Sequence, residues 1–534
     1  MNVRIFRLRI AAATFACAVS VLAGTATTTA QTVRVEVDPA LGEVLRGRDG
    51  RLVLFLTRPD ARVGRRARPA DFFFPHDPQP LFAIDAAGDA LLAGEVELGP
   101  DAPGFDGRRA ARLGELPAGT YRAQVAWIHT RGDVGDFQLV RGNALSDPVS
   151  LQLAAGRTAT LRLHRATHDR AFPAHVQGVE EFVVRSRRLS EHYGRDFELR
   201  AGVRLPRVLR PGTLYPAVYE VPGFGGDHGQ VAWTVASSPS GSDQALLADH
   251  AFHIVLDPSS PNGHTLFLDS DNNGPWAQAL VHELLPALEA RYPLRPHAQA
   301  RVLRGHSSGG WTVLHLALHF PELFSAAWST APDPVDFRHF QRIDLYRHVN
   351  AYQLPDGSET PSVRNRAGTV TMTVRQENLL EHVLGPNLTS AQQWASWQAC
   401  FGSRRPDGSV RPLFDPLTGE IDRDEAERYR RFDLAHLLAT QPQRYVPLWR
   451  ERIRLIVGAA DDFYLDEAVA SLAAVLDALD PADPAAPTTR PVRPGTVRIV
   501  PGATHGSILR SREALAIPGE VVRHFRAAGV WPGP

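Results

Sequence analysis

The sequence predicts an α/β fold in which a doubly wound, mostly parallel sheet follows a β-rich N-terminal domain. From about residue 180 to residue 334, short apolar runs alternate with helix-spaced patterns, which is typical of parallel strands joined by helices. Before residue 170 the apolar runs are short and are separated by Gly, Pro and Asp, which indicates strands and turns. Between residues 335 and 449 the α/β pattern stops and then resumes, so we expect an insertion there.

The N-terminal domain, residues 31–170, is expected to resemble a β-sandwich, because it holds several short strands with turn signals between them. It contains no phosphate-binding glycine motif, and nothing in its sequence indicates chemistry. The expected strands are Thr32–Val37, Arg51–Leu56, Tyr121–Ile128, Val149–Leu153 and Thr158–Leu163.

Residues 180–530 are predicted to form the α/β domain, in which reactive groups gather at the carboxyl ends of the strands. Two leading strands are expected at Glu181–Leu189 and Phe197–Leu205. The later strands are expected at Tyr215–Val221, Ala251–Leu256, Ala300–Leu303, Phe324–Trp328, Ile453–Val457 and Thr496–Val500. Helices are expected at Trp276–Arg291, Trp311–Phe320 and Pro518–Ala528.

The insertion, residues 335–449, is rich in Arg, Gln, Pro and aromatic residues. Helical patterns cover Ser390–Cys400 and Asp424–Ala439, and no run in it looks like a strand of the main sheet. Insertions at this place commonly cover the site, so we expect a cap that sets substrate shape. The alternative is an insertion that has only a structural role.

The first 30 residues have the pattern of a cleavable signal peptide. Three arginines between positions 4 and 9 precede an apolar run from Ile10 to Leu22, and small residues lead to a cut after Ala30. The run is too short to span a bilayer, which favours a removable signal over a membrane anchor. We therefore expect a soluble protein in the periplasm or outside the cell.

Charge and cysteine content exclude several classes of function. The 58 basic and 58 acidic residues give a formal net charge of zero, which argues against nucleic acid or an acidic membrane surface as the main partner. Of the two cysteines, Cys17 lies in the predicted signal, which leaves Cys400 alone in the mature chain. An intramolecular disulfide and a cysteine-based metal site are therefore excluded.

The pentapeptide Gly305-His306-Ser307-Ser308-Gly309 follows an apolar run and precedes a helical pattern. A serine on a sharp turn between strand and helix is exposed for nucleophilic attack, and glycines on both sides permit that turn. The sequence thus predicts Ser307 as a catalytic nucleophile. The alternative is a glycine-rich turn between strand and helix that has no chemical role.

A serine nucleophile needs a base, and the base needs a carboxylate to orient it. His505 lies in a glycine-bracketed loop after the last expected strand and is the predicted base. Asp461 and Asp462 end the strand before it, between serine and histidine in the chain, which is the triad order of α/β-hydrolases. We favour Asp461 as the acid, with Asp462 and then Asp333 as alternatives.

The oxyanion of the transition state needs main-chain donors. One should be the N–H of Ser308, which follows the nucleophile. Another should come from the glycine-rich segment Val221–His228, where we assign Phe224 or Gly225 without separating them. Each donor is typically worth about 3 kcal/mol in the rate. The segment could also be a plain glycine-rich loop.

Residues Asp269–Gly274 copy the opening of a calcium loop, but the twelfth position is Leu280 where a glutamate is needed, which excludes an EF-hand. A turn that starts the Trp276 helix explains the segment better than another calcium site. We expect neither a metal nor a cofactor.

These motifs together resemble secreted bacterial α/β-hydrolases of the esterase family that includes esterase D-like, feruloyl and enterochelin esterases. The resemblance covers roughly residues 180 to 530, and the β-rich domain in front resembles the enterochelin-esterase arrangement more loosely. It implies a triad of Ser307, Asp461 and His505. The matching segments are Val221–His228, Asp269–Trp276, Gly305–Gly310, Gly458–Leu465 and Gly502–Gly506.

The expected function is hydrolysis of carboxylic esters through an acyl-enzyme intermediate. The expected substrate is a small-molecule or polysaccharide-linked ester. A peptidase or an acyltransferase could use the same triad, and a non-catalytic secreted protein that binds a glycan or a protein is the alternative from another class. The sequence does not indicate an oligomeric state.

Overall fold

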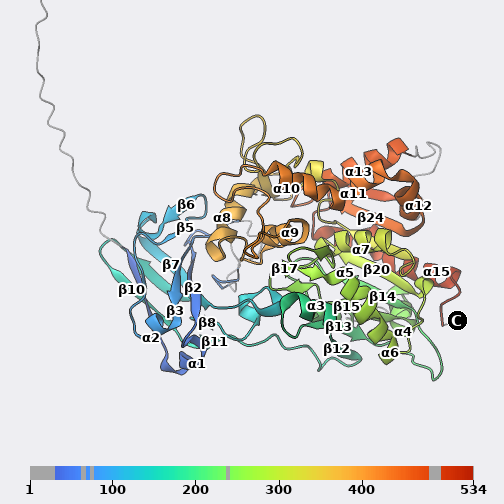
Figure 1. Cartoon of the computed structure of the whole chain (residues 1–534), viewed down its shortest axis with the longest axis horizontal. Helices are drawn as coiled ribbons and strands as arrows, with labels where there is room; N and C mark the ends of the chain where they lie inside the picture. The colour runs from blue at the N-terminus through green and yellow to red at the C-terminus, as the bar shows by residue number, and fades with distance from the viewer. Residues whose placement is uncertain (1–30, 62–67, 72–76, 236–240, 480–494, 533–534) are drawn as a thin grey trace, which may run out of the picture.

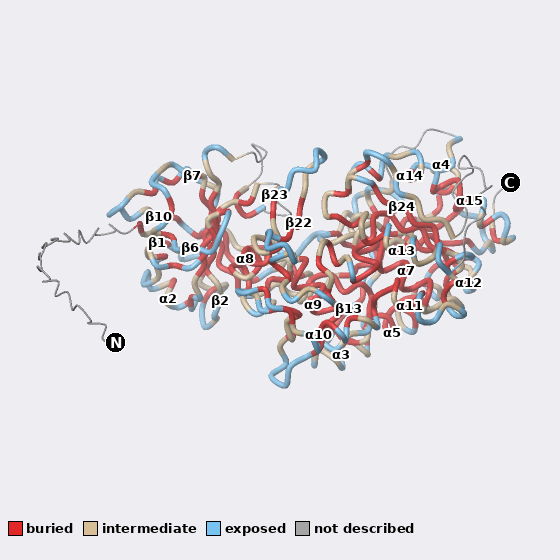
Figure 2. Tube along the Cα trace, turned by 90° about the horizontal axis from the view of Figure 1, so that it is seen from above, coloured by how far each residue is buried: buried red, intermediate tan, exposed pale blue. Residues whose placement is uncertain are grey.

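The computed structural model describes residues 31–61, 68–71, 77–235, 241–479 and 495–532. The predicted signal peptide, residues 1–30, lies outside the described residues. Figure 1 shows a strand-rich N-terminal part beside a larger α/β part, with helices of the insertion between and above them. In Figure 2 buried residues fill the interior of both parts. Within the described ranges, no helix is both long enough and apolar enough to cross a membrane.

The N-terminal part contains two sheets. The smaller sheet has the order β10-β1-β4, and the larger has the order β11-β8-β7-β2-β3-β5-β6, with β9 paired to β7. Three of the five expected strands have the expected bounds, and the two others are longer by one to two residues at an end. The strands are β1 (Thr32–Val37), β2 (Asp49–Thr57), β3 (Leu81–Ala87), β4 (Glu97–Leu98), β5 (Pro103–Phe105), β6 (Ala110–Arg112), β7 (Gly119–Ile128), β8 (Ala144–Leu145), β9 (Val149–Leu153), β10 (Thr158–Leu163) and β11 (Arg165–Ala166).

Alternate residues of the larger sheet pack into two different cores, because side chains of a strand point to opposite faces. From β2, Leu52 and Leu54 join a core shared with β1 and β10 of the smaller sheet. Val53 and Phe55 point the other way and pack against apolar side chains near Leu384 in the insertion. The insertion therefore completes the second core of the N-terminal part.

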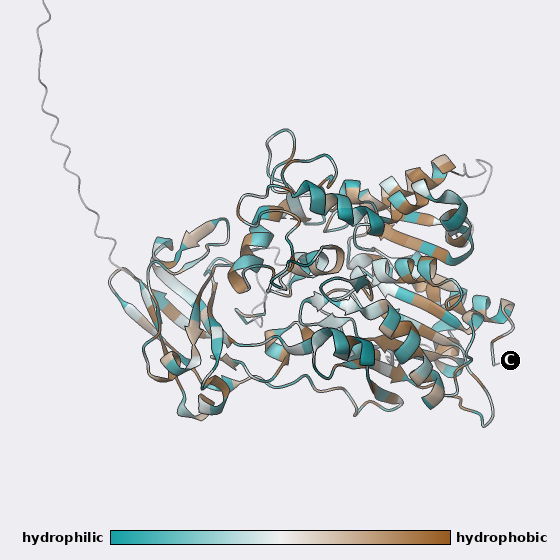
Figure 3. Ribbon diagram, in the orientation of Figure 1, coloured by the Kyte–Doolittle hydropathy of each residue, from teal (hydrophilic) through white to brown (hydrophobic). Residues whose placement is uncertain are grey.

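The α/β part is built on an eight-stranded sheet with the order β12-β13-β15-β14-β20-β21-β24-β25. The first two pairings are antiparallel and the remaining five are parallel. Figure 3 shows hydrophobic colour along these strands, as expected for strands covered on both faces. The strands are β12 (Val179–Arg185), β13 (Glu198–Arg204), β14 (Ala217–Val221), β15 (Phe252–Leu256), β20 (Arg301–His306), β21 (Ala326–Thr330), β24 (Ile453–Gly458) and β25 (Val497–Val500).

Helices connect these strands. The main ones are α3 (Arg187–Tyr193), α4 (Asp243–His250), α5 (Trp276–Ala279), α6 (Leu285–Arg291), α7 (Ser308–His319), α13 (Leu465–Leu479) and α15 (Ile517–Ala527). The helix expected at Trp276–Arg291 is present, with a π-helical turn at Leu280–Leu284 between α5 and α6.

Two expected elements differ most from those observed. The leading strand expected to reach Leu189 ends at Arg185, because Ser186 caps α3 by accepting a hydrogen bond from Leu189 N at 3.1 Å. The single helix expected at Asp424–Ala439 is broken into α10 (Arg423–Arg428), a 3-10 turn and α11 (Leu434–Thr440). Asp433 causes the break by capping α11.

The insertion folds over one edge of the α/β part and reaches the N-terminal part. Its elements are β22 (Pro361–Arg364), β23 (Val370–Thr373), α8 (Val374–Leu384), α9 (Gln393–Phe401), α10, α11 and α12 (Pro442–Arg452). The strands β22 and β23 form their own small sheet. Arg131 of the N-terminal part donates hydrogen bonds to the carbonyls of Thr389, at 2.9 Å, and Leu384, at 3.1 Å.

The shared second core gives a stability prediction. Leu384→Ala should lower the free energy of unfolding by about 2–5 kcal/mol, because the leucine is 1% exposed and its loss leaves a cavity against the N-terminal sheet. Leu417→Ala is the matched control in the same insertion: its side chain is 60% exposed, so the change should stay within about 0.5 kcal/mol. Urea unfolding followed by tryptophan fluorescence measures both, and equal losses would contradict the shared core.

Candidate active site

Ser307 lies in the sharp turn between β20 and α7. Its φ of 57° and ψ of −123° form a strained backbone conformation that residues with a Cβ rarely adopt. Three main-chain hydrogen bonds fix it: Ser307 N donates to Thr330 O at 3.0 Å, and Ser307 O accepts from Trp311 N and Asp333 N at 3.0 and 3.1 Å. The turn therefore holds the hydroxyl at the carboxyl edge of the sheet.

The two glycines around Ser307 are needed for close packing. A Cβ on Gly305 would overlap the main chain of Gly309, and a Cβ on Gly309 would overlap the carbonyl of Val221 at the end of β14. The start of α7 can thus pack directly on two neighbouring strands only because these positions lack a side chain. This agrees with the role predicted for the glycines from the sequence.

His505 follows β25 and is bound by both neighbouring acids. Its Nδ1 donates to Asp461 Oδ2 at 2.8 Å, and its main-chain N–H donates to Asp462 Oδ2 at 2.9 Å. Asp461 is fully buried, and its other oxygen accepts a hydrogen bond from Phe463 N at 2.9 Å. Asp461 therefore binds the side chain of His505, whereas Asp462 binds its main chain and supports the loop that carries it.

The third candidate acid, Asp333, is held by the insertion. Asp333 Oδ2 accepts a hydrogen bond from Trp397 Nε1 of α9 at 2.7 Å, and the side chain is 3% exposed. Burial raises the pKa of Asp333 to about 6. Because the Asp333 side chain bonds to Trp397, while the ring of His505 bonds to Asp461, Asp333 does not orient the histidine directly.

The carboxylates around His505 control its protonation. Burial acts against the charged imidazolium, but the charge and hydrogen bond of Asp461, with the charges of Asp333 and Asp462, raise the pKa of His505 above its ordinary value. The neighbouring His306, whose ring centroid lies 4.6 Å from that of His505, has the opposite shift. Burial and the positive charge of His505 lower the pKa of His306 to about 3, so His306 is neutral.

Arg364 of the insertion fixes the loop that carries the two acids. Its Nε donates to the carbonyl of Asp461 at 2.7 Å, and its main-chain N–H donates to the carbonyl of Asp462 at 2.8 Å. Its guanidinium also pairs with Asp466 at 2.6 Å and lies 4.4 Å from the ring centroid of Tyr464. The position of the acids thus depends on a residue outside the sheet fold.

Ser307 and His505 line one cavity of about 510 Å³, which we call the catalytic cavity. Phe224, one of the two expected oxyanion residues, lines it as well. The neighbouring Gly223 is so close to the nucleophile that a Cβ added there would lie 3.1 Å from Ser307 Cβ. Other lining side chains are those of His306, Asp333, Gln341, Gln393, Trp397, Asp462, Phe463, Leu465 and Thr504.

The turn that contains Phe224 and Gly225 is closed by a hydrogen bond from Gly226 N to Gly223 O, at 3.0 Å. His264, in the hairpin strand β17 (Gly263–His264), supports this turn by donating from Nε2 to Pro222 O at 2.9 Å. His264 Nδ1 accepts from Leu266 N, so the proton is at Nε2, and burial lowers the pKa of His264 to about 4. A neutral histidine therefore positions the turn.

Sequence reasoning missed Arg364, Trp397 and His264, which support the predicted residues from outside their motifs. Trp397 lies three residues after Trp394, a spacing that predicts a helix face but not its contact with Asp333. Arg364 and His264 carry no sequence signal of their own. Among the described residues, no cluster of three or more His, Cys, Asp or Glu side chains is arranged to hold a metal ion.

Comparison with protein families gives the class of the chain. The sequence model of the family described as "Putative esterase" matches residues 190–476, which is more than half of the 534 residues. The chain belongs to this esterase family. The match includes the serine turn and both acids of the site but ends before His505. A comparison with curated proteins found no match.

The solved structures that match this esterase-family chain are distant from it. A ferulic acid esterase is 11% identical, with a TM-score of 0.37, and the likeness covers 65% of this chain and 98% of that one. An S-formylglutathione hydrolase from Agrobacterium tumefaciens is 14% identical, with a TM-score of 0.35 and coverage of 67% and 97%. A fluorophosphonate-binding serine hydrolase from Staphylococcus aureus is 9% identical, with a TM-score of 0.36 and coverage of 65% and 98%. At such TM-scores these likenesses carry no argument about substrate.

The contacts of His505 predict which acid matters for its reactivity. Asp461→Asn should slow fluorophosphonate labelling of Ser307 by about 10³–10⁴-fold, because the amide no longer favours the histidine tautomer that accepts the serine proton. Asp462→Asn should slow it by no more than about tenfold, since the amide oxygen can still accept from His505 N–H. Labelling rates measured by mass spectrometry compare the two, and the reverse order would assign the orienting role to Asp462.

Proposed function

We propose that the chain is a secreted serine hydrolase that cleaves carboxylic esters through an acyl-enzyme intermediate. The observation that carries the proposal is a serine on a strained turn in the same cavity as a histidine bound to a buried aspartate. Membership of the esterase family supports the ester as substrate class. Export is proposed from the signal-like first 30 residues, with the periplasm or the medium as destination.

In the proposed mechanism Ser307 Oγ attacks the ester carbonyl while His505 Nε2 takes its proton. Asp461 keeps the other ring nitrogen protonated and stabilises the imidazolium. The N–H groups of Ser308 and of Phe224 or Gly225 bind the oxyanion. His505 then protonates the leaving alcohol, and water, activated by the same histidine, releases the acid from Ser307. These steps require no cofactor.

The finer architecture belongs to the same proposal. We assign to the insertion, residues 335–449, the role of a cap over the catalytic cavity, because its Gln393 and Trp397 line that cavity. The N-terminal sheets would act as a β-sandwich-like domain packed against this cap. Access of the substrate to the catalytic cavity would then depend on both the insertion and the N-terminal domain.

The nucleophile is tested with residues 31–534, wild type beside Ser307→Ala, on p-nitrophenyl acetate, butyrate and octanoate. Wild type should turn over at least one ester, and the variant should lose at least about 10⁴-fold in kcat. Wild type that forms a fluorophosphonate adduct without turnover would keep the triad and point to a peptidase or acyltransferase. The absence of both the adduct and turnover would refute the triad and favour a non-catalytic binding protein.

The pKa of His505 predicts the pH dependence. Only neutral His505 can accept the serine proton, and the pKa of His505 is raised, so kcat/KM should fall as the pH drops through a midpoint above 6.5. The Asp461→Asn variant should move this midpoint to lower pH, because it removes the negative charge that contributes most to stabilising the His505 imidazolium. By linkage, the stability from the His505–Asp461 pair is present at low pH and is lost as pH rises through the folded-state pKa of His505. A midpoint unchanged by the substitution would contradict the assignment.

A further inference from the structure

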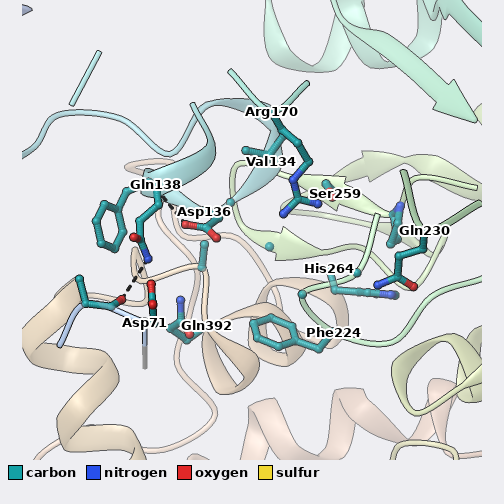
Figure 4. Close-up of a pocket in the computed structure, with 18 residues that line it drawn as sticks. Asp71, Val134, Asp136, Gln138, Arg170, Phe224, Gln230, Ser259, His264 and Gln392 are labelled. Carbon is teal, nitrogen blue, oxygen red and sulfur yellow. Dashed lines mark hydrogen bonds between the residues drawn. The ribbon is translucent and has the colours of Figure 1, made fainter. Parts of the chain in front are cut away.

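A second cavity, of about 450 Å³, lies where the N-terminal part, the α/β part and the insertion meet. We call it the junction cavity. Figure 4 shows polar side chains from all three parts around it, with the ring of Phe224 at one side. The side chains used in the argument are those of Asp71, Asp136 and Gln138 from the N-terminal part, Phe224 and Gln230 from the α/β part, and Gln392 from the insertion.

The junction cavity adjoins the catalytic cavity. Phe224 lines both, and the consecutive residues Gln392 and Gln393 line one each. Phe224 also belongs to the turn beside Ser307. For an ester whose carbonyl lies at Ser307, the route by which one of its two halves would enter the junction cavity passes Phe224.

The walls of the junction cavity are closely packed. A Cβ added to Gly135 of the N-terminal part would lie 2.9 Å from Gly263 Cα, and a Cβ added to Gly263 would lie 2.6 Å from the carbonyl oxygen of Ala391 in the insertion. Ser396 of α9 also donates to the carbonyl of Asn262, at 3.0 Å. The main chains of the three parts therefore pack directly against one another at these glycines, and this close packing gives the cavity a defined shape.

The lining offers hydrogen-bond acceptors without matching donors. Gln138 Nε2 donates to Ala70 O at 3.0 Å, which orients the amide, and its buried Oε1 accepts no hydrogen bond from the residues that the structure describes. Asp136 also lines the cavity and accepts a hydrogen bond from Gln138 N through Oδ1, at 2.9 Å. A buried acceptor without a donor is unfavourable, so a ligand that donates to it gains binding energy.

The charges of the cavity narrow the chemistry of the ligand. Arg170, the cation of the lining, forms an ion pair with Asp227, and Asp71 forms one with Arg68, so the lining offers an anion no unpaired cation, while Asp136 adds a carboxylate that disfavours it. An alkyl chain would remove water from these carboxylates and from the amides without replacing the lost hydrogen bonds. Hydroxyl groups donate to carboxylate and amide oxygens and also accept from the amide N–H of Gln230 and Gln392.

We propose that the junction cavity is a substrate subsite that binds a hydroxyl-bearing half of the ester, with Asp136 and Gln138 as specificity-determining residues. The inference rests on the proposed ester hydrolysis at Ser307. It gives the N-terminal domain, whose sequence shows no functional motif, a direct part in the choice of substrate.

The test uses two matched pairs of esters. Glycerol monobutyrate and propyl butyrate differ by hydroxyl groups in the alcohol half, and methyl gluconate and methyl hexanoate differ in the acyl half. Wild type should prefer the hydroxylated member of one pair, which also identifies the half that enters the junction cavity. Gln138→Met should lower kcat/KM for that member by about tenfold and leave propyl butyrate, methyl hexanoate and p-nitrophenyl acetate within about twofold.

Gln152→Met is the matched control, because Gln152 is an exposed residue of β9 outside the lining and pairs with Thr120. Asp136→Asn is a second variant, which keeps an acceptor for Gln138 N and should show the same selective loss. A uniform change on all esters, or no change beyond that of the control, would overturn the subsite alone. Wild type that turns over none of the p-nitrophenyl esters would instead overturn the proposed ester hydrolysis and the subsite with it.

Discussion

The strained backbone of Ser307 is the constraint on which the rest of the α/β part depends. A positive φ at a serine persists only where neighbouring bonds fix it, and here they come from the ends of β21 and α7 and from Asp333. The first eleven residues of α7, from Ser308 to Leu318, are all buried, so the helix cannot tilt to relieve the turn. Sheet order, helix burial and the place of the nucleophile are thus parts of one arrangement.

The residues that could be predicted from the sequence are those whose chemistry coincides with a change of secondary structure. Ser307, Asp461 and His505 each follow a strand of the sheet, and glycines mark all three turns. The sequence favoured Asp461 without excluding Asp462, and in the structure both bind His505, one through its ring and the other through its main-chain N–H. Their difference lies in the direction of two adjacent side chains, which no spacing pattern encodes.

Elements outside the sheet were harder to predict, for physical reasons that differ. The helix α8 was missed, although Thr373 and Gln376 form a capping box that marks its start. The break between α10 and α11 follows from the cap at Asp433, which competes with a continuous helical pattern. Arg364 acts through a carbonyl of a distant loop, and such a contact depends on the fold and not on a motif.

The place of α8 has a consequence for how the protein is made. One face of the larger N-terminal sheet, with Val53 and Phe55, is covered by side chains near Leu384. The ribosome completes that sheet long before it reaches α8, and domains generally fold from the N-terminus as they emerge. During synthesis, therefore, the nascent sheet exposes an apolar face, and it needs shelter from aggregation until more than two hundred further residues have been added.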